Sequence, residues 1–190
     1  GPRVGSVAPG VAHDVEAQKI FKLKLPRLRS LAVHHIHGYP LEVLAKNKSL
    51  TNLESICFYP HAHEYGDDGA YIRLDGFRAL CRSKNLPNLK HVELNCSDVG
   101  NDGIAELVKS PLLKQLRVLD LSHGRINDEV VDVLAKAELG GLEKLVLTGN
   151  YLTKSGINAI KKTGVNLEAK SQYSGNPDDE FEYLWHGDIE

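Results

Sequence analysis

Between Leu89 and Ile160 the chain repeats one pattern of hydrophobic positions three times, as LKHVELNCSDVGNDGIAELV, LRVLDLSHGRINDEVVDVLA and LEKLVLTGNYLTKSGINAIK. Each copy has a leucine, an apolar residue three positions later and another two positions after that. This spacing predicts a short strand, which is followed by a turn and an amphipathic helix. The copies begin at Leu89, Leu116 and Leu142. A repeat of roughly 20–29 residues predicts a solenoid of stacked strand and helix units.

Two further copies precede these three, so we expect about five repeats. The first has a helix beginning near Pro40, because proline is tolerated in a first helical turn. The second is longer than the others, and its extra residues form an insertion at 60–76. Insertions in repeat proteins lie on one face and often bind partners, although a tolerated surface loop is an equally good interpretation. The residues predicted to face inward in these two copies are Leu28, Leu31, Val33, Leu53, Ile56 and Phe58.

The helices of the last three repeats have polar residues at their expected starts. Asn101, Asn127 and Thr153 are each predicted to accept a hydrogen bond from a backbone N–H in the first turn. Asp102 and Asp128 follow the two asparagines, and their charges complement the positive helix end. We therefore expect these charges to be structural.

The chain is predicted to divide into three segments: a lead-in and cap at 1–24, the repeats at 25–170, and an acidic, aromatic segment at 171–190. The alternation in FKLKL predicts a short strand or half-repeat covering the first repeat, and Val165 to Ala169 are expected to form a last edge strand. In the final segment, the apolar residues are predicted to cover the open end of the core. The alternative is a linear motif for a partner. The residues concerned are Phe181, Tyr183, Leu184 and Trp185.

These repeats resemble leucine-rich repeats of the long, helix-containing kind typified by ribonuclease inhibitor, and the chain is similar to short uncharacterised bacterial proteins of that family. The resemblance implies an α/β solenoid, a right-handed βα superhelix with its parallel sheet on the concave face. It also implies an asparagine or cysteine in the turn after each strand. Asn150 matches that pattern, whereas Ser97 and Gly124 depart from it.

Composition narrows the possible functions. The chain has 190 residues, 42% of them hydrophobic and 25% charged, which is typical of one globular domain. Its formal net charge is −2, and outside the acidic segment the positive excess is too mild to predict nucleic-acid binding. No apolar run is long enough for a membrane span, and no signal peptide is expected. Three cysteines without metal-type spacing, Cys57, Cys81 and Cys96, favour a reducing cytoplasm.

The concave face of the sheet is the expected binding surface. Glu93 and Asp120 are predicted to lie side by side on adjacent strands, about 5 Å apart. Like charges in that position destabilise a sheet, so their presence favours binding of a protein partner with a basic segment. Screened surface charges beside His91 and Lys144 are the alternative. The predicted contact residues on this face are His34, Tyr59, His91, Glu93, Asn95, Asp120, Ser122, Lys144 and Thr148.

Histidines gather at the end of the first strand and in the insertion, which neighbours it in a solenoid. Several imidazoles and a carboxylate would suit a transition metal. A metal-binding protein or metal-dependent enzyme is therefore the alternative function, and histidines without a metal are the other interpretation. The candidate ligands are His35, His37, His61, His63 and Glu64.

Catalytic patterns are not found. The sequence has no glycine-rich phosphate loop, no G-x-S-x-G motif and no H-E-x-x-H motif. We therefore predict a non-catalytic protein-binding module without a cofactor, acting through the concave face and the insertion at 60–76. A further alternative is a piece of a larger multidomain regulator, because Gly1 and Pro2 are typical of the residues left by a tag-removing protease.

Overall fold

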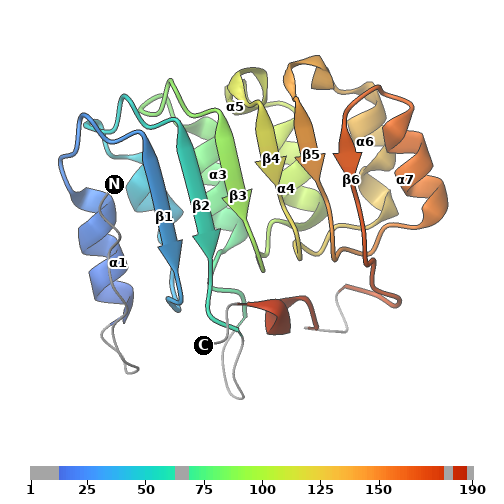
Figure 1. Ribbon diagram of the computed structural model, residues 1–190, viewed down its shortest axis with the longest axis horizontal. Helices are drawn as coiled ribbons and strands as arrows, with labels where there is room; N and C mark the ends of the chain where they lie inside the picture. The colour runs from blue at the N-terminus through green and yellow to red at the C-terminus, as the bar shows by residue number, and fades with distance from the viewer. Residues whose placement is uncertain (1–12, 63–68, 178–181, 188–190) are drawn as a thin grey trace.

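A computed structural model describes residues 13–62, 69–177 and 182–187. In these residues, six parallel strands form one sheet whose spatial order is the chain order (Figure 1). This arrangement confirms the predicted α/β solenoid. The strands are β1 Ser30–His34, β2 Ser55–Tyr59, β3 His91–Leu94, β4 Val118–Asp120, β5 Lys144–Val146 and β6 Leu167–Glu168.

Helices cover one face of the sheet and leave the other face open (Figure 1). The helices are α1 His13–Lys22, α2 Leu41–Ala45, α3 Leu74–Arg82, α4 Gly100–Leu107, α5 Pro111–Gln115, α6 Val131–Lys136 and α7 Lys154–Lys161. Short 3-10 turns are η1 Asp128–Val130, η2 Leu139–Gly141 and η3 Glu182–His186. No helix in the described part of the chain is long and apolar enough to cross a membrane.

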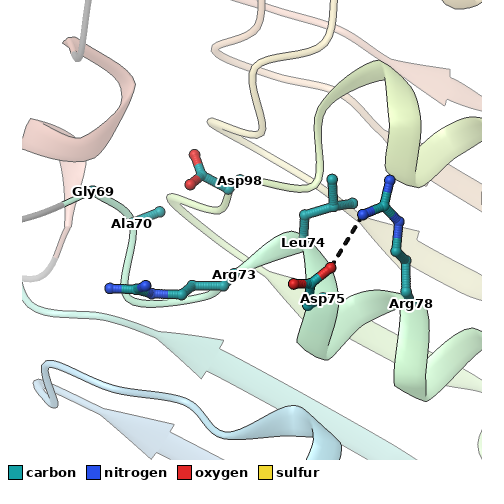
Figure 2. A pocket seen from close by; sticks show the side chains of 7 residues that line it. All are labelled: Gly69, Ala70, Arg73, Leu74, Asp75, Arg78 and Asp98. Carbon is teal, nitrogen blue, oxygen red and sulfur yellow. Dashed lines mark hydrogen bonds and ion pairs between the residues drawn. The ribbon is translucent and has the colours of Figure 1, made fainter.

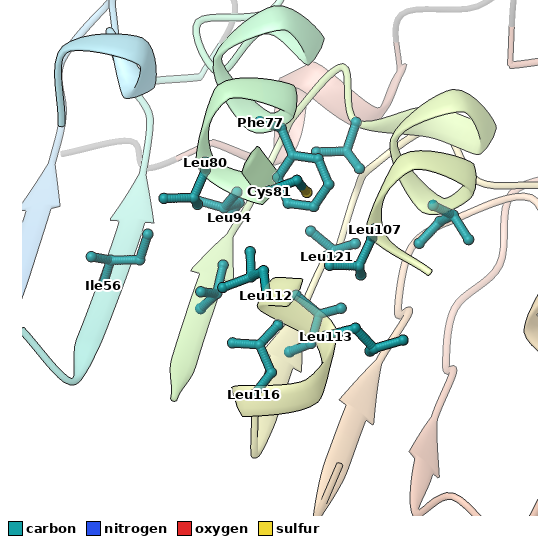
Figure 3. Close-up of a cluster of buried hydrophobic side chains, with 14 of the residues drawn as sticks. Ile56, Phe77, Leu80, Cys81, Leu94, Leu107, Leu112, Leu113, Leu116 and Leu121 are labelled. Carbon is teal, nitrogen blue, oxygen red and sulfur yellow. The ribbon is translucent and has the colours of Figure 1, made fainter. Parts of the chain in front are cut away.

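The core lies between the sheet and the helices, and the repeating leucines fill it. Leu119, Leu121, Leu145 and Leu147 are buried, as predicted from the alternation of each strand. Figure 3 shows how helix residues meet strand residues in the middle of this core. The residues labelled there are Ile56, Phe77, Leu80, Cys81, Leu94, Leu107, Leu112, Leu113, Leu116 and Leu121. Leu28, Leu31 and Val33 in the first repeat are only half-buried, because β1 is an edge strand.

The turns after β1, β3, β4 and β5 have a left-handed residue at the same repeat position. His35, Cys96, His123 and Gly149 all have positive φ there, between 49° and 61°. The backbone N–H of each donates to a carbonyl at the end of the next strand or just beyond it, at 2.9–3.2 Å. In the second repeat this position is Pro60, which has neither an N–H nor access to positive φ. The insertion therefore begins where the second repeat cannot make the common turn.

Gly149 shows why one of these turns requires glycine. Its φ is +61°, and a Cβ built on it would lie 2.3 Å from a ring atom of His123. The other left-handed positions hold residues with side chains, so they keep a conformation that L-residues adopt only at a cost.

Two local predictions are wrong. Of the two alternatives for the chain before the first repeat, the strand is wrong, because this segment forms helix α1. The helix buries Ala17 and Phe21, which are four residues apart and so share one helical face. Asn101 lies inside the first turn of α4 and caps no helix; it pairs with Asn127 instead, donating to Asn127 Oδ1 at 2.7 Å. The caps predicted at Asn127 and Thr153 are confirmed, since each side chain accepts a first-turn N–H.

Asn150 ties neighbouring repeats together from inside the turn. Its Oδ1 accepts the backbone N–H groups of Gly124 at 3.0 Å and Ile126 at 2.9 Å, and its Nδ2 donates to the carbonyl of Leu121 at 3.0 Å. The side chain is completely buried. Asn150 therefore satisfies backbone groups that a turn would otherwise bury without partners.

Candidate functional site

The open face of the sheet presents alternate residues of each strand, as predicted. In β2, for example, Ile56 and Phe58 are buried toward the helices, while Ser55, Cys57 and Tyr59 are half-buried on the open face. The same alternation in β3 and β4 places Glu93 and Asp120 on the open face. The structure therefore places the predicted contact residues of these strands on one surface, which we call the concave face.

Glu93 and Asp120 form a carboxylate pair at the middle of the concave face. They lie directly opposite each other in the register of β3 and β4. Cys57, which faces Glu93 from β2, donates from Sγ to Glu93 Oε2 at 3.2 Å. Asp120 Oδ1 accepts from the backbone N–H of Ser122 at 2.9 Å and from its hydroxyl at 2.6 Å. Neutral donors therefore satisfy part of the hydrogen-bonding capacity of the two carboxylates.

No cation forms an ion pair with this carboxylate pair within the described residues, although the nearby charge of Lys144 acts to lower the pKa of Asp120. The nearest predicted cation is Lys144, but its Nζ lies 3.0 Å from Glu168 Oε2, and Lys170 binds the other oxygen of the same carboxylate at 2.8 Å. Hydrogen bonds from Lys170 and Lys144 lower the pKa of Glu168 to about 2. Neither Glu93 nor Asp120 forms an ion pair with any residue that the structure describes. The pair is thus a local concentration of negative charge.

Burial changes the proton affinity of the groups around the pair. It raises the pKa of Asp120, against the opposing effect of the hydrogen bonds from Ser122. Burial and the hydrogen bond to Glu93 raise the pKa of Cys57 to about 12. Burial and the charge of Asp120 raise the pKa of Tyr59 to about 12. Cys57 therefore stays a neutral thiol at physiological pH, which makes it a hydrogen-bond donor and a poor nucleophile.

We expect Asp120→Asn to stabilise the fold at neutral pH. The raised pKa means that the folded state holds this proton more tightly than the unfolded chain, whose Asp pKa is about 3.9. The favourable contribution of Asp120 is therefore present below the unfolded pKa and lost as pH rises through the folded pKa. Denaturant unfolding should show the advantage of the variant at neutral pH and its decrease in acid.

The exposed Glu138→Gln is the control for that measurement, because it removes one carboxylate from the loop between α6 and η2, away from the concave face. Its unfolding free energy should match that of the wild type. A less stable Asp120→Asn at neutral pH would mean that the bonds from Ser122 to the ionised carboxylate outweigh the cost of burying it.

The remaining predicted contact residues contribute unequally to the concave face. His34 is exposed on β1 and stacks on Tyr59, with ring centroids 5.4 Å apart. His91 is exposed and Thr148 half-buried. Asn95 and Ser122 are buried, so each offers little surface to a partner.

The histidines predicted as metal ligands are only partly brought together. The rings of His37 and His61 lie 4.9 Å apart, and Tyr71 packs edge-on against His37 at 4.9 Å. His63 and Glu64 lie outside the described residues. Within the described ranges, no three side chains of His, Cys, Asp or Glu are grouped as metal ligands would be.

Sequence reasoning missed a polar cluster at the edge of the sheet where the strands end. We define the edge cluster as Asp98, Arg125 and Tyr183. Tyr183 donates from its hydroxyl to Asp98 Oδ1 at 2.6 Å, and Arg125 donates to the same oxygen at 3.3 Å. The guanidinium carbon of Arg125 lies 5.8 Å from the centre of the Tyr183 ring. Burial, followed by the bond to Asp98, raises the pKa of Tyr183, so it remains a hydrogen-bond donor.

In this cluster η3 lies at the carboxyl ends of the strands, below β3 and β4 (Figure 1). Tyr183 and Leu184 are buried against Ala70 and Cys96. Trp185 is 63% exposed, so the prediction that it covers the core is wrong. Phe181 lies outside the described residues.

Two further contacts fix the end of this segment. The ring of His186 stacks on His123, with centroids 4.7 Å apart. Burial, followed by the charge of His186, lowers the pKa of His123 to about 4. Gly187 lies so close to the backbone of Ala62 that an added Cβ would come within 2.4 Å of its nitrogen. The segment therefore rests on both the insertion and the turn after β4.

A cavity of about 310 Å³ opens beside the edge cluster (Figure 2). Arg73 and Asp98 line one side of it, and the ion pair between Arg78 and Asp75 lies on the other. Arg78 also binds Asp102, at 3.3 Å. Because carboxylates already hold this arginine, the cavity is not an obvious anion site.

Two segments of the chain match a leucine-rich repeat family in sequence, and the fold is similar to that of solved bacterial proteins. The sequence model of the family described as "Leucine Rich repeat" matches residues 85–108 and 114–135. A crystal structure of a protein from Bacteroides fragilis is similar, with 25% identity and a TM-score of 0.59, over 78% of this chain and 43% of that one. An internalin from Listeria monocytogenes has 17% identity and a TM-score of 0.45, over 88% of this chain and 48% of that one.

The chain spans less than half the length of either solved structure. No curated protein sequence matches it significantly. The first matched segment contains β3 and α4, and the second contains β4 and most of α6. The parallel sheet continues with further strands on both sides of these two repeats. Residues 85–108 and 114–135 are therefore leucine-rich repeats, and the chain has the fold of an α/β leucine-rich repeat solenoid.

Proposed function

We propose that this protein is a non-catalytic interaction module whose concave face binds a basic segment of a protein partner. Repeat solenoids use their extended concave surfaces for binding. The observation that carries the proposal is the carboxylate pair of Glu93 and Asp120, which has no cation partner among the described residues. A lysine or arginine from a partner would remove the repulsion between the two charges.

The pair is suited to charge recognition more than to chemistry. Cys57 and Tyr59 beside it are neutral donors with raised pKa values, and nothing adjacent supplies an activated nucleophile. The insertion at 60–76 starts directly after Tyr59, at the end of β2, and we propose it as a second surface for the partner. We also place the protein in the cytoplasm, because its three cysteines are free thiols.

A fluorescent lysine-rich peptide tests the concave face directly. We expect Glu93→Gln combined with Asp120→Asn to weaken its binding by on the order of 1–3 kcal/mol, since central charged contacts carry most of an interface's energy. Anisotropy titrations at several salt concentrations measure this loss. Binding should also weaken as pH falls, because Asp120 is protonated at a higher pH than an ordinary aspartate.

The matched control neutralises two exposed carboxylates away from the concave face, with Asp132→Asn and Glu138→Gln. It should bind the peptide like the wild type. Equal losses in both double variants would show that only net charge matters, and this result would remove the carboxylate pair as the binding site. Asp120→Asn alone distinguishes a loss of peptide binding from a loss of folding stability, because it should weaken binding while stabilising the protein.

A further inference from the structure

A second charged surface lies near the amino ends of β1 and β2, at the opposite edge of the sheet from the edge cluster. Residues 17–49 contain seven lysines or arginines and one carboxylate, Glu42. Four of these lysines line a groove of about 510 Å³, which we call the basic groove. The groove is lined by Lys22, Lys24, Val43, Lys46, Asn47, Lys48 and Ser49.

The basic groove is held open by hydrogen bonds between the loops that follow α1 and α2. Asn47 Nδ2 donates to the carbonyls of Phe21 at 2.8 Å and Leu23 at 3.0 Å. The Ser49 hydroxyl donates to the carbonyl of Leu23 at 3.3 Å, and the Ser49 N–H to Asn47 Oδ1 at 2.9 Å. These bonds fix the two loops against each other, so the lysines extend from a rigid base.

The positive charge of the groove is not neutralised within the described chain. None of its four lysines forms an ion pair with a residue that the structure describes. Glu42 faces the other way, since its carboxylate lies next to Gly76 on α3. Lysines at helix C-termini complement the helix dipole, which accounts for Lys22 and Lys46. Lys24 and Lys48 lie beyond the helix ends, so the dipole does not explain them.

Apolar side chains accompany these charges. Val43 lines the groove, and the adjoining loop exposes Leu23 at 49% and Leu25 at 39%. They are two of the three large hydrophobic residues exposed in the described part of the chain. Single-stranded nucleic acid is bound by aromatic side chains that stack on bases, and the groove lining has none. Lysines beside aliphatic residues instead complement a peptide that alternates carboxylates and apolar side chains.

We propose that the basic groove binds an acidic segment of a protein partner, anchored by an apolar side chain on Val43 and Leu23. The chain's own η3 segment is at the other edge of the sheet, where the strands end (Figure 1), whereas the groove is formed by loops that precede β1 and β2. The η3 segment is therefore not the occupant, which we place on another molecule. The basic groove is positively charged and lies apart from the negatively charged pair of Glu93 and Asp120. The two surfaces therefore favour partner segments of opposite charge.

A fluorescent peptide of alternating glutamate and leucine tests this proposal, with the matching glutamine and leucine peptide as the uncharged probe. We expect the wild-type protein to bind the acidic peptide and not the uncharged one. Lys24→Glu with Lys48→Glu should weaken binding roughly tenfold or more, because it reverses contact charges. Lys161→Glu with Lys162→Glu, exposed at the end of α7, changes net charge equally and should leave affinity unchanged.

Four results would overturn the proposal. The first is absence of binding by the wild-type protein, and the second is an equal loss in the two lysine variants. The third is tighter binding of a single-stranded oligonucleotide than of the acidic peptide. The fourth, measured by sedimentation of the protein alone, is concentration-dependent assembly that the groove variant abolishes, because a second copy would then replace the separate partner. Retained binding by the Glu93 and Asp120 double variant would show that this site is independent of the concave face.

Discussion

Leu121→Ala is expected to lower the free energy of unfolding by about 2–5 kcal/mol, the range for truncating a buried leucine. The Leu121 side chain is completely buried between the sheet and the helices (Figure 3). Truncation removes apolar area from the core and leaves a cavity that rigid neighbours fill only in part. Leu145, opposite Leu119 on the next strand, should show a loss in the same range. Equilibrium denaturation in urea, followed by circular dichroism, measures both losses.

Leu23→Ala is the matched control, because it makes the same chemical change at a side chain that is half exposed. It should cost less than about 0.5 kcal/mol, as surface substitutions usually do. A loss below about 1 kcal/mol at Leu121 would contradict the inward register of β4.

Tyr183→Ala should cost about 3–5 kcal/mol, the range for truncating a buried aromatic residue. The ring is completely buried in the cluster with Ala70, Cys96 and Leu184. Its loss also leaves Asp98 without one of its two side-chain hydrogen-bond donors, and Arg125 without the ring beside it. Thermal and chemical unfolding should both register this loss, and the exposed apolar surface should bind a hydrophobic dye.

Trp185→Ala tests whether the loss of stability is specific to the buried Tyr183 or follows the removal of any aromatic side chain from this segment. Trp185 is mostly exposed, two residues away on the same 3-10 turn, and its removal should cost less than about 1 kcal/mol. If Trp185→Ala destabilised the protein more than Tyr183→Ala, the segment would not be held through the edge cluster.

The repeat core could be predicted because each of its determinants is local in sequence. Alternation along a strand places Leu119 and Leu121 on one face, and nearly equal spacing brings equivalent residues of neighbouring repeats into register. The open face follows from the same alternation, which is why Glu93 and Asp120 were expected to be opposite each other. The structure has them paired in this register.

Other features depend on contacts that spacing does not encode. Tyr183 and Asp98 are 85 residues apart, and their meeting depends on the path of the C-terminal segment. Lys144 was expected beside the carboxylate pair, but Glu168 on β6 competes for it. A signal for α1 was available, since Ala17 and Phe21 have helical spacing, but the alternation in FKLKL pointed to a strand. The net charge of the whole chain does not reveal the local group of lysines that lines the basic groove.

The return of the C-terminal segment to the edge cluster has a consequence for how the protein unfolds. In a solenoid each repeat contacts only its neighbours, so end repeats can fray one at a time. Here Tyr183 is bonded to Asp98 in the turn after β3, and the chain between them includes β4, β5 and β6. Opening the last repeats while this contact holds would produce a closed loop, which has less conformational entropy than a free end. The contact therefore couples the unfolding of the C-terminal repeats and favours their unfolding in one cooperative step.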